Sequence, residues 1–120
     1  LDMIEGEVGF GNAMSVNPDW SKATKGLGSD YHIIQMTFKN HGCCGHTFPS
    51  IDGALHLQKQ HGFSHKDVKH IRLHTYKAGL NIIDNNNPEG EYQAKFSIQY
   101  TVAHALVRGS VRLNAFDPDH

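Results

Sequence analysis

The chain has 120 residues, of which 38% are hydrophobic and 19% charged, and its formal net charge is −1 from 11 basic and 12 acidic residues. These values are typical of one globular domain, and the mixed charges argue against a nucleic-acid-binding platform, which normally has a basic face. No apolar run reaches the roughly 18 residues of a membrane span, and no basic-then-apolar opening indicates a signal peptide. We therefore expect a protein that does not enter a membrane. The two cysteines are neighbours in sequence, which favours free, reduced thiols, so we also expect a cytoplasmic location.

Glycine, asparagine, serine and aspartate dominate residues 1–31, where hydrophobic periodicity is weak. We interpret this segment as an irregular N-terminal arm of a single domain that spans residues 1–120. The glycines at 26 and 28 have no strand-to-helix context around them, so they do not predict a phosphate-binding loop.

Two segments alternate between apolar and polar residues in the way that half-buried strands do. In the first, Ile34, Met36 and Phe38 would share one face, which predicts a strand near 32–39. In the second, a similar alternation predicts a strand near 68–76, with Ile71, Leu73 and Thr75 on its inner face.

Two other segments follow helical spacing. Residues 50–61 are predicted to be a helix, with Pro49 at a first helical position and Gly62 as a C-terminal stop. Residues 91–107 carry two apolar stripes, which predicts a longer helix covered from more than one side and ended by Gly109. The order strand, helix, strand, helix predicts an α+β domain of two layers.

Between the first strand and the first helix lies a loop that contains His41, Cys43, Cys44 and His46. These residue types bind zinc, but their spacing differs from the common structural sites, so we expect no metal and no other cofactor. A cysteine nucleophile with a histidine base is a second alternative, since a helix N-terminus lowers a thiol pKa. The third is a tight loop whose cysteines only pack. By their residue types alone, Lys39 is a solvated strand-end charge and Tyr100 a core aromatic.

Residues 39–54 read Lys-x-x-x-Cys-Cys-x-His-Thr-x-Pro-x-Ile-Asp-x-Ala. This pattern resembles a signature in the C-terminal domain of the MmgE/PrpD family, which contains 2-methylcitrate dehydratases, cis-aconitate decarboxylases and iminodisuccinate epimerases. Weaker similarity extends over four further segments: 1–10, 61–63, 68–71 and 94–100.

The resemblance implies the C-terminal α+β half of a two-domain, homodimeric enzyme whose active site lies between a helical domain and this one. It implies catalytic roles for Lys39, His46 and Tyr100, and we place His41 and Cys44 with Lys39 as substrate-binding residues. In another version of the motif, Cys44 instead of His46 takes the position of the family's histidine. The implied chemistry removes a proton or carbon dioxide beside a carboxylate of a small polycarboxylic acid and needs no metal.

No counterpart of the helical domain is present in these 120 residues, so we expect the chain alone to lack half of an active site and to be inactive. The expected partners are a small carboxylate ligand and either a helical domain or further copies of the chain. Two functions therefore remain open. One is a domain of a lyase or isomerase, and the other is a non-catalytic, oligomerising or partner-binding module that retains the fold.

Overall fold

The computed structural model describes residues 2–118. The chain divides into two compact units, one up to Thr37 and one from Phe38 onward, and each is described by itself. The first unit contains the short helix α1 (Phe10–Met14) and two 3₁₀ turns, Trp20–Lys22 and His32–Gln35. Its apolar side chains are largely exposed, for example Val8 at 99% and Val16 at 91%, so the described part of this unit has little core.

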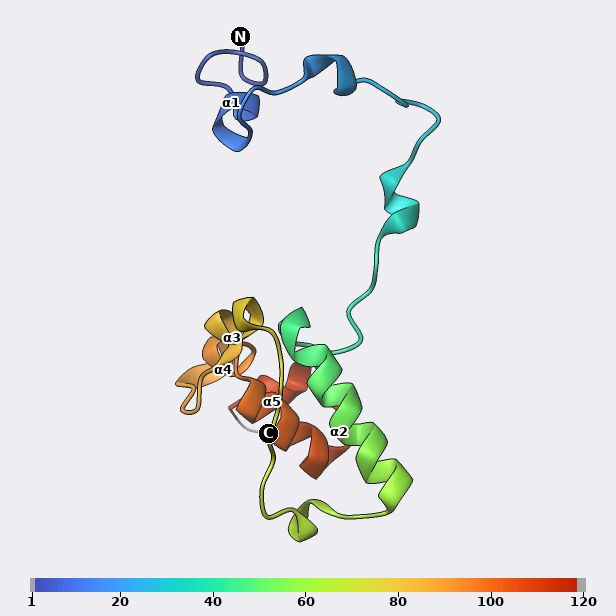
Figure 1. The fold of residues 1–120 in the computed structure, drawn as a ribbon, viewed down its shortest axis with the longest axis vertical. Coiled ribbons are helices and arrows are strands. Elements are labelled where there is room, and N and C mark those ends of the chain that lie inside the picture. Colours follow the sequence, from blue (N-terminus) through green and yellow to red (C-terminus); the bar gives the residue numbers. More distant parts are fainter. Residues whose placement is uncertain (1, 119–120) are drawn as a thin grey trace. The chain divides into compact units, whose positions relative to one another are not determined.

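The second unit holds the other four α-helices of the described residues, which are coloured from green to red in Figure 1. They are α2 (Phe48–His61), α3 (Lys77–Ile83), α4 (Gly90–Ala94) and α5 (Ile98–Arg108). Three 3₁₀ turns complete it: Gly45–Thr47, His65–Asp67 and Leu113–Phe116.

Helix α2 forms where its local signals predict it. Pro49 occupies the first turn, where its missing N–H costs no intrahelical bond, and Gly62 ends the helix in the left-handed conformation at φ 67°. Gly62 N–H donates to the Gln58 carbonyl, which satisfies one of the terminal acceptors. The predicted helix near 50–61 is therefore confirmed, with two further residues at its start.

The core lies between α2 and α5, which pack against each other (Figure 1). Ile51 of α2 and Val102 and Ala105 of α5 are at most 1% exposed. The amide of Gln58 also donates to the Leu106 carbonyl across this contact, at 3.0 Å. Burial of one apolar face of each helix, more than helix propensity, holds elements of this length together.

The predicted α+β fold is wrong for residues 2–118, because none of these residues forms a β-strand. His32–Gln35 is a 3₁₀ turn, and residues 36–39 and 68–76 have no regular structure. A strand exists only when its backbone pairs with a neighbour, and alternation in sequence does not supply that neighbour. The expected inner face is accordingly not buried, since Ile71 is 41% and Leu73 36% exposed.

The predicted continuous helix at 91–107 is also wrong, because Ser97 divides it into α4 and α5. Ser97 has an extended backbone at φ −102° and ψ 113°, and its hydroxyl oxygen accepts from Tyr100 N–H as the N-cap of α5. The same hydroxyl donates to the Asn85 carbonyl at 2.6 Å. A capping serine that is also tied to a distant loop favours a helix start over a helix interior.

Among residues 2–118, none of the helices combines the length and the apolar character that a membrane crossing requires.

Candidate functional site

The loop before α2 is joined by backbone hydrogen bonds to two distant parts of the second unit. Gly42 N–H donates to the Val111 carbonyl and Cys44 N–H to the Lys95 carbonyl, each at 2.9 Å. Gly42 also lies too close to the residues after α5 for a side chain, because a Cβ there would be 2.8 Å from the Leu113 nitrogen. The loop, the α4–α5 junction and the segment after α5 are therefore held around one point.

A cavity of about 810 Å³ lies where these three segments meet. Its volume is within the range of roughly 300–1,000 Å³ that is usual for small-molecule sites. Three of its lining residues are cationic, namely Lys39, Lys95 and Arg112, and none of the described lining residues is an aspartate or glutamate. The other lining residues include Asn40, His41, Cys43, Cys44, Phe96 and Asn114.

The three cations differ in how far the protein neutralises them. Lys95 forms an ion pair with Glu91 one turn earlier, and its ammonium lies 5.6 Å from the centre of the Phe116 ring. Within residues 2–118, Lys39 donates only to the backbone carbonyl of Cys43, at 3.4 Å. The guanidinium of Arg112 is exposed and pairs with no carboxylate among residues 2–118. Lys39 and Arg112 thus give the cavity an uncompensated positive charge, which favours an anionic ligand.

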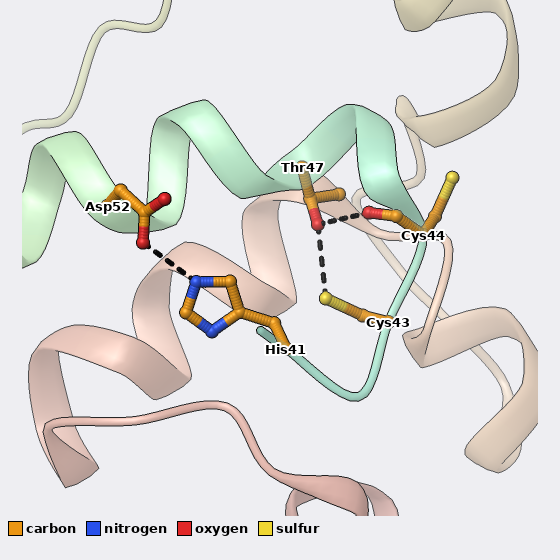
Figure 2. Close-up of polar contacts among 5 residues, drawn as sticks. All are labelled: His41, Cys43, Cys44, Thr47 and Asp52. Atoms are coloured by element: carbon orange, nitrogen blue, oxygen red, sulfur yellow. Dashed lines mark hydrogen bonds and ion pairs between the residues drawn. The ribbon is translucent and has the colours of Figure 1, made fainter. Parts of the chain in front are cut away.

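A buried histidine forms part of the same wall (Figure 2). His41 is 9% exposed, and its Nε2 lies 2.8 Å from the Asp52 carboxylate on α2. The edge of its ring packs on Phe48, with the ring centres 5.1 Å apart and the planes at 80°. The carboxylate and the aromatic ring together fix the orientation of the imidazole.

The two cysteines have different environments (Figure 2). Cys43 is 4% exposed, and its Sγ lies 3.2 Å from Thr47 Oγ1. Thr47 uses its one hydroxyl hydrogen on the Cys44 carbonyl at 2.7 Å, so Cys43 must donate its S–H to Thr47. Burial raises the pKa of the Cys43 thiol. Cys44 is less buried and has no such bond.

This difference predicts selective thiol chemistry. At pH 8, iodoacetamide is expected to modify Cys44 at least about tenfold faster than Cys43, because only the thiolate reacts and the raised pKa of Cys43 keeps it protonated. Mass spectrometry of the folded protein would measure the two rates, with the urea-unfolded protein as the control in which they converge. Equal rates in the folded protein would contradict this assignment.

The structure brings only some of the predicted site residues together. Lys39, His41 and Cys44 line the cavity, whereas His46 and Tyr100 are not among its lining residues. His46 Nδ1 forms a hydrogen bond with the Tyr76 hydroxyl. The Tyr100 hydroxyl donates to the Ala115 carbonyl at 2.6 Å and so holds the turn that follows Arg112 and Leu113.

Sequence reasoning missed Lys95, Arg112 and Asp52 as site residues. Lys95 and Asp52 both lie inside segments that carried the family resemblance, so the motif itself could have drawn attention to them. For Arg112 the sequence holds no signal, since tertiary contacts such as the Gly42–Val111 hydrogen bond bring its segment to the loop.

The geometry gives no support to the zinc alternative. Across the part of the chain that the structure describes, no three histidine, cysteine, aspartate or glutamate side chains converge as metal ligands would.

One comparison with known proteins gives a match. A family model for the MmgE/PrpD C-terminal domain matches residues 41–120, which are 80 of the 120 residues. No curated protein and no solved structure matches the chain.

Proposed function

Since the chain belongs to the MmgE/PrpD family, through a match to its C-terminal domain, we propose that the second unit supplies the carboxylate-binding wall of a lyase or isomerase site. The substrate would be a small polycarboxylic acid that loses a proton, water or carbon dioxide next to a carboxylate. The helical domain that the family resemblance implies would supply the facing wall.

The observation that carries this proposal is the charge of the cavity. Lys39 and Arg112 line it without a carboxylate partner, and no acidic side chain lines it among the described residues. Arginine matches a carboxylate with two parallel hydrogen bonds, and lysine supplies a compact positive charge. A ligand with two or more carboxylates can engage both cations at once, whereas a monocarboxylate cannot.

Each cation has a distinct role in this proposal. Arg112 would hold a carboxylate remote from the reacting carbon and so orient the substrate. Lys39 would face the carboxylate next to the reacting carbon, where negative charge develops as an enediolate forms.

Catalytic roles for His46 and Tyr100 remain part of the proposal, but each would require an exchange of hydrogen-bond partners. His46 would have to leave Tyr76, and Tyr100 would have to leave the Ala115 carbonyl. If Cys44 takes the histidine position of the family motif, its thiol already lines the cavity.

Citrate binding tests the proposal. Isothermal titration calorimetry of the full chain is expected to show binding that weakens about tenfold or more in Lys39→Gln, because a hydrogen bond to a charged group contributes about 1.5–3 kcal/mol. Lys59→Gln is the matched control, since Lys59 is an exposed lysine near the end of α2. Equal affinities of the two variants, or no citrate binding by the wild type, would contradict the proposal.

A second candidate function is a non-catalytic module that assembles with a helical partner domain or with copies of itself. It is favoured by exposed apolar side chains in the second unit, of which Tyr92 is 75%, Leu113 72% and Tyr76 53% exposed. Exposed apolar surface of this kind is typical of interaction sites. The citrate experiment also separates the two functions, since a purely structural module has no reason to bind a polycarboxylate through Lys39.

A further inference from the structure

The pair formed by His41 and Asp52 has no role in the carboxylate-binding function above. We infer that His41 is the proton-transfer residue of the cavity and that Asp52 is its positioning residue. This inference rests on the proposed function, because it needs a polycarboxylate bound beside Lys39 and Arg112.

The contact with Asp52 decides which ring nitrogen of His41 carries hydrogen. An ionised carboxylate can only accept hydrogen bonds, so the 2.8 Å contact with Asp52 places the hydrogen on His41 Nε2. In a neutral ring, Nδ1 then has a free lone pair and can accept a proton. A carboxylate that fixes the tautomer and orientation of a histidine in this way is a recurrent arrangement in proton-transfer sites.

The other ring nitrogen of His41, Nδ1, has no hydrogen-bond partner among the described residues. In Figure 2 the second ring nitrogen is on the side of the imidazole away from Asp52 and carries no dashed contact. No described residue forms a hydrogen bond with Nδ1, although His41 is only 9% exposed. His41 is among the residues that line the same cavity as Lys39 and Arg112, which is where the proposed ligand needs a proton acceptor.

Two residues of α2 hold the His41 imidazole in place. Phe48 meets the imidazole edge-on, with the ring centres 5.1 Å apart, and Asp52 holds it from α2. Asp52 and Phe48 both belong to α2, which packs on α5, so both contacts with His41 are anchored on a packed helix. A proton acceptor must be held to within a fraction of an ångström, and anchoring on a packed helix provides this better than a loop does.

The chemical step balances without any further reactant. A C–H bond next to a substrate carboxylate breaks, and its electron pair moves onto that carboxylate as an enediolate that Lys39 stabilises. The proton goes to His41 Nδ1, and the resulting imidazolium keeps its Nε2–H on Asp52. Return of the proton from His41 to the carbon restores the neutral ring.

The test is long-range ¹H–¹⁵N NMR of the full chain labelled at histidine, with the His41 signals assigned by their loss in His41→Gln. Without ligand, at pH 8, His41 is expected to be in the Nε2–H form. Asp52→Ala is expected to mix the two tautomers, whereas the control Asp117→Ala leaves the pattern unchanged. On titration with citrate, the Nδ1 signal of His41 is expected to move at least about threefold further than that of His56, an exposed histidine on α2.

The outcomes separate the inference from the proposed function. If calorimetry detects citrate binding while the Nδ1 signal stays in place, the inference is overturned and the carboxylate site stands. An Nδ1–H tautomer in the ligand-free protein overturns the inference whether or not citrate binds. Absence of citrate binding overturns the proposed function, and the inference with it, even if the tautomer is as expected.

Discussion

Replacing Ile51 by alanine is expected to lower the free energy of unfolding by about 2–5 kcal/mol, the usual range for removing a large buried aliphatic side chain. Ile51 is 0% exposed and belongs to the buried core to which α5 contributes Val102 and Ala105. The substitution removes three carbon atoms there, and the two packed helices cannot fully close the space that is left. The loss is a large part of the 5–15 kcal/mol that is typical of a whole domain.

Urea denaturation followed by circular dichroism would measure this change from the midpoint and slope of the transition. Leu57→Ala is the matched control, since Leu57 lies on the same helix but is 49% exposed. We expect the control to lose less than about 1 kcal/mol. Similar losses for the two variants would show that α2 does not pack on α5 in the way described.

Replacing Gly42 by alanine is expected to weaken citrate binding at least about tenfold and to destabilise the fold by about 1–3 kcal/mol, as overpacking does. The added Cβ would lie 2.8 Å from the Leu113 nitrogen and 2.9 Å from the Arg112 carbonyl carbon. Both are backbone atoms, so the two segments must separate. The Gly42–Val111 hydrogen bond then weakens, and Arg112 moves away from Lys39.

Gly45→Ala is the control for this prediction, because a Cβ at Gly45 meets nothing within 4 Å. Calorimetry with citrate and urea denaturation would be applied to both variants. Full citrate affinity in Gly42→Ala would mean that the contact between the loop and the segment after α5 does not shape the binding site.

Features set by residues close in sequence were predicted correctly. The limits of α2 follow from Pro49 and Gly62, and the end of α5 follows from Gly109, which has a left-handed backbone at φ 76°. These signals act within one helical turn, so no distant contact is needed to interpret them. The family resemblance is also confirmed. Its central motif occupies one continuous stretch of the chain, so it can be recognised without any tertiary contact.

Features that depend on pairing across the chain were not determined by the sequence pattern. The alternation at 68–76 indicates which side chains could share a face, but a strand needs a partner backbone, and the described residues provide none. Likewise, the apolar stripes of 91–107 are compatible with one continuous helix. The hydrogen bond from Ser97 to Asn85, twelve residues earlier, favours the break that the structure shows.

The residues of the candidate site also fall into those that the sequence places together and those that only tertiary contacts bring together. The sequence by itself placed His41 and Cys44 in one loop and Lys39 at the end of the predicted strand just before it, because these residues are neighbours in the chain. Only the tertiary structure decided that Arg112 and Lys95 face that loop, and that Asp52 orients His41. The physical reason is that two backbone hydrogen bonds, from Gly42 and Cys44, select which distant segments close the cavity. Every residue type except proline carries the same backbone N–H and C=O groups, so a residue's type does not indicate its backbone partner.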